Sequence, residues 1–131
     1  MAANIAPIFS KQGAHGWDKL LTGNTTRDGS SGTLYTIFTA DATNGSRVNK
    51  VILQPLGTNV ATVARLFVNN GSATTTAANN TMIKEVAMAA TTSSETAALA
   101  STEVPLDLVL KQGYKLFAVI GTTVAAGIAV S

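Results

Sequence analysis

The chain has 131 residues, enough for one domain with a buried core, and only 12% of them are charged, which gives a formal net charge of +2. It contains no cysteine, which excludes disulfides and thiolate metal sites. Its basic residues are scattered singly and lack interleaved aromatic residues, which argues against nucleic-acid binding. So few charges leave little to desolvate when subunits meet, and such a surface suits either an uncharged monomer or a subunit of an assembly.

The N-terminal segment, residues 1–12, is predicted to be an extended arm or an edge strand, where a proline is tolerated. Its large apolar residues are Ile5, Pro7, Ile8 and Phe9. They need a partner, which is either the chain's own sheet or a neighbouring protein. The segment has no basic region followed by a long apolar stretch, so we expect no secretory signal. The apolar C-terminal stretch is too short, and too broken by glycine, for a membrane span.

Trp17 opens a short predicted strand over residues 17–21, a position in which tryptophan usually packs in a core or against a sheet edge. Residues 22–32 are rich in Asn, Asp, Gly, Ser and Thr and are predicted to form only turns. The stretch 34–39 alternates, with Tyr35 and Ile37 on one face, and carries apolar groups on both faces. We expect that strand to be covered on both sides, either within a sandwich or by a subunit contact.

The stretch 46–72 is interpreted as an antiparallel hairpin. Its two runs, 48–56 and 60–68, are rich in β-branched residues and are separated by Gly57-Thr58-Asn59, while Asn-Gly steps stand at both ends. In the second run, the charge of Arg65 indicates that its alternating row of side chains faces outward. The alternating set predicted to face inward is Thr62, Ala64, Leu66 and Val68.

The second half of the chain continues the pattern of strands and turns. Residues 73–80 are predicted to be a flexible connector, 81–90 a half-buried strand, and 94–99 at most one helical turn. Strands are then predicted at 104–110, 114–120 and 124–130. In total we expect about eight or nine strands and little helix, in an all-β fold: an antiparallel β-sandwich, jelly-roll-like, forming a single domain over residues 13–131.

No constellation of catalytic residues is recognisable. His15 is the sole histidine and lies in a glycine-bounded turn with Asp18 three residues on, but no serine elbow or cysteine accompanies them. The acidic residues have neither the spacing of a metal site nor a sign of converging in a cleft. We therefore predict no catalytic, cofactor-binding or metal-binding residues and expect that the protein is not an enzyme.

Turn and core segments spread over almost the whole chain carry a family resemblance. They are residues 3–9, 55–59, 67–72, 94–98, 105–106, 113–116 and 121–127. Through them the chain resembles the small head decoration, or cement, proteins and related virion structural proteins of tailed bacteriophages. The resemblance implies a protein on the outer surface of the virion head, made in the host cytoplasm, that binds the major capsid protein as a homotrimer and stabilises the capsid. It implies no cofactor, nucleic acid or membrane.

An assembly protein of this kind needs contact residues. The candidates are Ile5, Pro7, Ile8, Phe9, Trp17, Tyr35 and Ile37. The alternative function is a carbohydrate- or host-receptor-binding module on a phage head or tail fibre. Sugar sites usually present several exposed aromatic side chains, and glycan binding that depends on Trp17 or Tyr35 would favour this alternative.

Overall fold

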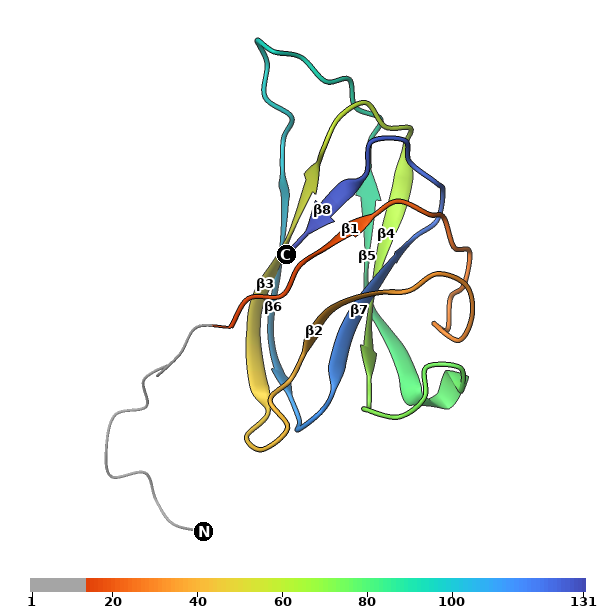
Figure 1. Ribbon diagram of the computed structural model, residues 1–131, viewed down its shortest axis with the longest axis vertical. Helices are drawn as coiled ribbons and strands as arrows, with labels where there is room; N and C mark the ends of the chain where they lie inside the picture. Colours follow the sequence, from red (N-terminus) through yellow and green to blue (C-terminus); the bar gives the residue numbers. More distant parts are fainter. Residues whose placement is uncertain (1–13) are drawn as a thin grey trace, which may run out of the picture.

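The computed structural model describes residues 14–131, so the predicted arm at 1–12 lies outside the described residues (Figure 1). The described chain forms eight strands and one short 3₁₀ helix. They are β1 (Asp18–Leu20), β2 (Tyr35–Thr39), β3 (Ser46–Pro55), β4 (Thr62–Asn69), η1 (Ala77–Asn79), β5 (Asn80–Met88), β6 (Thr102–Leu110), β7 (Lys115–Ile120) and β8 (Ile128–Val130). This confirms the predicted all-β sandwich. Within the described residues, no helix is long and apolar enough to cross a membrane.

The strands form two antiparallel sheets, ordered β1-β8-β3-β6 and β2-β7-β4-β5. Four strand pairs are nested along the chain: β1 with β8, β2 with β7, β3 with β6, and β4 with β5. The chain therefore doubles back at residues 70–79, and its two halves run side by side as one long ribbon. That ribbon folds over, so that consecutive strands other than β4 and β5 lie in different sheets.

The predicted hairpin over residues 46–72 is wrong, because its two strands belong to different sheets. β3 pairs with β6 and β8, whereas β4 pairs with β5 and β7. The link at 56–61 crosses from one sheet to the other. Its Asn59 instead pairs through the backbone with Thr91, in the loop that joins β5 to β6. A period-two apolar pattern identifies strands and their buried face but does not identify their partners.

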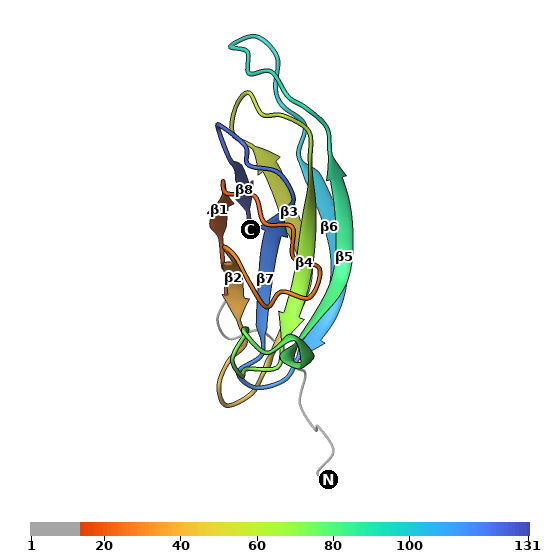
Figure 2. The ribbon, with the colours of Figure 1, turned by 90° about the vertical axis from the view of Figure 1, so that its right-hand side faces the viewer.

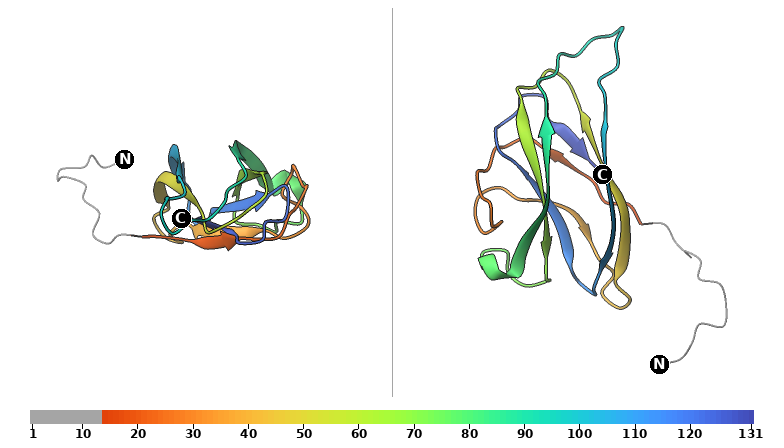
Figure 3. Two further views of the ribbon diagram at one scale, coloured as in Figure 1. Left: turned by 90° about the horizontal axis from the view of Figure 1, so that it is seen from above. Right: turned by 180° about the vertical axis from the view of Figure 1, so that it is seen from behind.

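The sandwich is closed along one side and open along the other. β1 lies beside β2 and β7 across the two sheets. Seen along the long axis, β5 and β6 lie far apart on the opposite side (Figure 3). The links 56–61, 89–101 and 121–127 gather at one end of the molecule (Figures 1 and 2).

The core fills the space between the inward rows of the two sheets. Its fully buried residues include Leu20, Val51, Leu53, Leu66, Leu116, Ile120, Ile128 and Val130. Ala64 and Leu66 face inward as predicted, and the alternating row of β6 also lies on the core side. Solvent-facing Arg47 and Lys50 on β3 pair with Asp107 and Glu103 on β6.

Both strands on the open side carry features that discourage edge-to-edge pairing. On β6, Pro105 lacks a backbone N–H, and Leu106 and Asp107 together lie opposite Asn49, which makes a bulge. Asp107 has a φ of 47°, in the left-handed region. On β5, Ile83 is the extra residue of a bulge, directly before exposed Lys84. Bulges, prolines and charges of this kind keep an edge strand from templating another sheet.

The predicted flexible connector at 73–80 is an ordered turn containing η1. Asn79 Nδ2 donates to the carbonyl of Ala73 at 2.9 Å, and Asn80 Nδ2 donates to that of Thr74 at 2.7 Å. Asn69 Nδ2 on β4 donates to Asn80 Oδ1 at 2.8 Å and ties this turn to the sheet. The helical turn allowed at 94–99 is absent, and the last strand is shorter than predicted.

Asp41, in the link between β2 and β3, offers a test of local electrostatics. Its Oδ1 accepts the N–H groups of Asn44 at 2.7 Å and Thr43 at 2.9 Å, which lowers the pKa of the carboxyl from 3.8. A lowered pKa adds stability above the unfolded-state value and loses it as pH falls through the folded-state value. Asp41→Asn should therefore be less stable than the native protein at pH 7. Urea unfolding should show this difference in stability shrinking as pH falls below 3.8. An equal difference at pH 7 and at low pH contradicts the lowered pKa of Asp41.

Candidate binding site

The outer face of the β2-β7-β4-β5 sheet is covered by the link between β1 and β2. Beneath this link the rings of Phe67 and Phe117 stack with centroids 5.0 Å apart and planes at 4°. Leu34 packs against this pair. Gly29, with a φ of 71°, lies so close that an added Cβ would be 2.7 Å from the ring of Phe117. Leu34, on the second apolar face predicted for residues 34–39, is thus covered by the protein's own chain. Phe38, predicted on the same face as Leu34, instead packs against the main core with Tyr35 and Ile37, because the register shifts between Thr36 and Phe38.

Asn24 organises this covering link from within. Its Nδ2 donates to the carbonyls of Ser31 at 2.7 Å and Thr33 at 3.0 Å, and its Oδ1 accepts the N–H of Thr26 at 3.0 Å. Its own N–H donates to the carbonyl of Ile120 on β7 at 2.6 Å. These bonds bind the link to itself and to the sheet, so a segment whose sequence predicts only turns has one defined shape.

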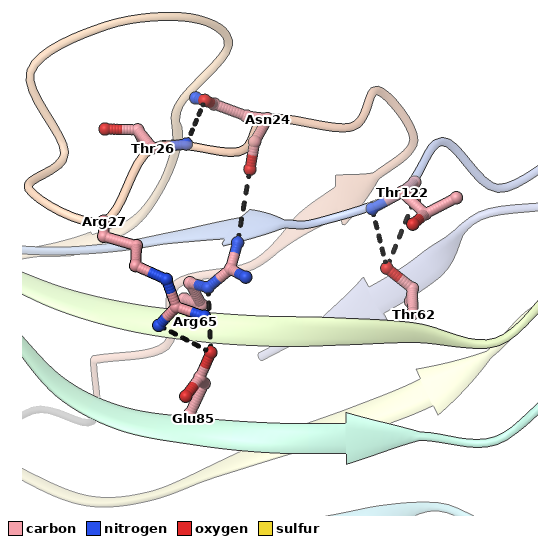
Figure 4. Close-up of polar contacts among 7 residues, drawn as sticks. All are labelled: Asn24, Thr26, Arg27, Thr62, Arg65, Glu85 and Thr122. Carbon is pink, nitrogen blue, oxygen red and sulfur yellow. Dashed lines mark hydrogen bonds and ion pairs between the residues drawn. The ribbon is translucent and has the colours of Figure 1, made fainter.

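A cluster of three charged residues fastens the same link to β4 and β5 (Figure 4). Arg65 Nε donates to Glu85 Oε1 at 3.0 Å, and Arg27 Nη1 lies 3.2 Å from the same oxygen. Arg65 Nη1 also donates to the carbonyl of Asn24 at 3.4 Å. Arg65 is only 8% exposed. Two guanidinium groups share one carboxylate, so the cluster carries one surplus positive charge.

Beside this cluster lies an open hollow of about 330 Å³, where β4 meets the start of the link between β7 and β8. Its lining residues are Ala61, Thr62, Val63, Arg65, Gly121 and Thr122. Thr62 Oγ1 accepts the N–H of Thr122 at 3.0 Å and donates to its carbonyl at 3.2 Å, which fixes one wall (Figure 4). A Cβ added to Gly121 would lie 3.4 Å from Arg65 Nη1 and 3.5 Å from Nη2.

The hollow presents a guanidinium edge, a threonine hydroxyl and small apolar walls, which suit binding of an anion rather than acid–base or nucleophilic chemistry. Within residues 14–131, no three His, Cys, Asp or Glu side chains gather as a metal site would require. His15 is exposed. Sequence reasoning placed Arg65 on the outer row but missed its burial and the hollow, because the residues that cover it are distant in the chain.

The predicted contact residues differ in how exposed they are in the structure. Trp17 is 73% exposed, contrary to the usual packing of tryptophan, and is available to a partner. Ile37 is 6% exposed and lies in the protein's own core, so we drop it from the contact candidates. Ile5, Pro7, Ile8 and Phe9 lie outside the described residues.

Tyr35 is half-buried, and its ring packs against the core. Its hydroxyl oxygen accepts the N–H groups of Leu21 at 3.2 Å and Thr22 at 2.9 Å. Burial raises the pKa of Tyr35, but the hydrogen bonds from Thr22 and Leu21 outweigh it and leave that pKa below its ordinary value of 10.0. With its hydroxyl occupied, Tyr35 is a structural residue more than a contact.

Other apolar side chains are exposed at positions that were not among the predicted contacts. Leu56 is 48% exposed and Val60 56% exposed, at the two ends of the crossing link. Val109, on the outer face of β6, is 73% exposed. The alternating pattern does not reveal this exposure, because it depends on whether a distant segment covers each face.

Comparison with known proteins gave no further assignment: no family model, no curated protein and no solved structure matches this chain.

Proposed function

We propose that the protein is a virion structural protein that decorates a bacteriophage capsid from the outer surface of the head, as a homotrimer bound to the major capsid protein. The observation that carries the proposal is the exposure of Trp17. Tryptophan has a large apolar surface and is normally well buried, and it is enriched among the few residues that dominate binding energy at protein interfaces. Trp17 is 73% exposed, and contact with a partner would bury this side chain.

The strand order supports the finer prediction of a jelly roll. A jelly roll has eight strands in two sheets, and the nested pairing of β1 to β8 agrees with such a rolled ribbon. Viral capsid and lectin domains use this architecture, so the topology is compatible with a virion role.

The surface supports contact through side chains rather than by strand addition. The bulge and charges on β5, and the bulge and Pro105 on β6, oppose edge pairing. On the same open side, Val86, Leu106 and Leu108 point to the core yet stay half-buried. Apolar area is therefore left over on that side, and burying it against a neighbour would stabilise an assembly.

The test measures assembly of the full-length chain. Light scattering should give three times the mass of one chain, and the protein should cosediment with heads that lack it. Because Trp17 is the sole tryptophan, its fluorescence should shift to shorter wavelength on binding. Trp17→Ser should weaken head binding about 30-fold, the effect of losing about 2 kcal/mol at an interface hot spot.

Val109→Ser is the matched control, since Val109 is equally exposed but lies on β6, at the opposite edge of the sheet from β1, and points away from the half-buried row of Leu106 and Leu108. It should retain native head binding and the native mass. A monomeric protein that does not bind heads would overturn the proposed function. If both variants weaken binding equally, Trp17 is not the contact.

A further inference from the structure

We propose that the hollow beside Arg65 binds the carboxylate of an acidic sugar residue. This inference is independent of the capsid role, because it rests on a different face and on different residues. The proposal rests on the guanidinium of Arg65, which is nine-tenths buried yet has an edge open to the hollow.

Arg65 has N–H groups that are available to bind a ligand. A guanidinium carries five N–H groups; two of them donate to Glu85 and to the Asn24 carbonyl. No described residue accepts a bond from Nη2. Nη2 lies 3.5 Å from the position of a Cβ added to Gly121, which lines the hollow together with Arg65. A carboxylate placed there would receive two parallel bonds from the Nη1–Nη2 edge, the geometry in which arginine binds carboxylates most strongly.

The surrounding charges favour an anion. Glu85 is shared by Arg65 and Arg27, which leaves one positive charge uncompensated. Gly121 keeps the edge accessible, because even a methyl group there would touch both Nη atoms. The hollow, about 330 Å³, lies at the lower end of the size range of small-ligand pockets and has room for one sugar ring. The exposed Thr122 offers a hydroxyl, and Ala61 and Val63 offer apolar contact.

The position of the hollow favours a sugar over an acidic peptide. Extended peptides bind by adding a strand to a free sheet edge. The hollow lies where β4 runs past the end of β7, and there β4 pairs with β5 on one side and is bonded to Gly121 on the other, since the Gly121 N–H donates to the carbonyl of Val63 at 2.9 Å. No main-chain edge is free there, so recognition must come from side chains, as it does for a sugar acid.

The test is a titration of ¹⁵N-labelled protein with glucuronate, followed by the amide signals of Gly121 and Thr122. Glucuronate should bind at least about tenfold more tightly than glucose, since a charged bidentate pair contributes about 1.4 kcal/mol or more. Arg65→Lys keeps the charge but loses the fork, and should weaken binding about tenfold. Gly121→Ala leaves every ion pair in place and should also weaken it, which guards against an Arg65 variant that fails to fold.

Lys50→Gln is the control, since Lys50 is a paired cation on the other sheet, and it should bind glucuronate normally. Equal affinity for glucose and glucuronate, or normal binding by Gly121→Ala, overturns the proposal. Acetate binding as tightly as glucuronate overturns the sugar assignment. Tighter binding of an oligoglutamate peptide overturns it in favour of a protein partner. Loss of head binding by Trp17→Ser leaves this result unaffected, so the two proposals fail separately.

Discussion

Replacing Asn59 with alanine is expected to lower the free energy of unfolding by about 3 kcal/mol, because one buried and one part-buried backbone donor would lose their acceptor. Asn59 is 5% exposed, and its Oδ1 accepts the N–H groups of Ala126 at 2.9 Å and Gly127 at 3.1 Å. Its Nδ2 donates to the carbonyl of Gly127 at 2.9 Å. One side chain thus joins the β3–β4 link to the β7–β8 link.

Asn49→Ala is the matched control for this substitution. Asn49 is exposed on β3, and none of the side-chain hydrogen bonds described for residues 14–131 involves it. The control should change the free energy of unfolding by less than about 0.5 kcal/mol. Urea unfolding of both variants measures the difference, and similar midpoints for the two would show that the Asn59 side chain does not hold the two links together.

Asn59 also shows where prediction from the sequence stops. The sequence identifies a Gly-Thr-Asn break between two apolar runs, and a hairpin is the shortest connection that such a break allows. What directs the chain across the sandwich instead is the bonding of Asn59 to residues 126–127 and to Thr91. These partners are distant in sequence, and no local pattern points to them.

The strands themselves could be predicted because burial imposes a period of two on each of them. Ala64 and Leu66 on β4, and the row beginning at Val104 on β6, lie on the core side as the alternation indicates. Which strands pair with each other could not be predicted. Every strand here is apolar on its inner face, and that face could be buried equally well beside several other strands. The candidate site escaped prediction for a similar reason: Arg65, Gly121 and Asn24 come from three separate segments.

The outer face of β7 shows the same limit. Phe117 and Val119 alternate with the inward residues and therefore read as a solvent-facing row, yet both are at most 1% exposed. The link between β1 and β2 covers them. The polar composition of this link predicts only turns. Its packing on the sheet requires Gly29, whose φ of 71° lets the backbone lie against the ring of Phe117.

Phe117→Ala is accordingly expected to lower the free energy of unfolding by about 3–5 kcal/mol, the usual cost of removing a buried phenylalanine ring and leaving a cavity. The loss includes the stacked contact with Phe67. Calorimetry or urea unfolding measures this change. Amide hydrogen exchange should also show faster exchange in residues 24–33, because their apolar support is gone.

Val109→Ala distinguishes a covered outer face from an uncovered one. Val109 is likewise an outward residue, but on β6 it is 73% exposed, so its truncation should change the free energy of unfolding by less than about 0.5 kcal/mol. If Phe117→Ala were as mild as Val109→Ala, the link between β1 and β2 would not be packed on the sheet in solution. The Arg65 hollow would then lose the Asn24 carbonyl that helps to hold its guanidinium in place, and the binding proposal would weaken with it.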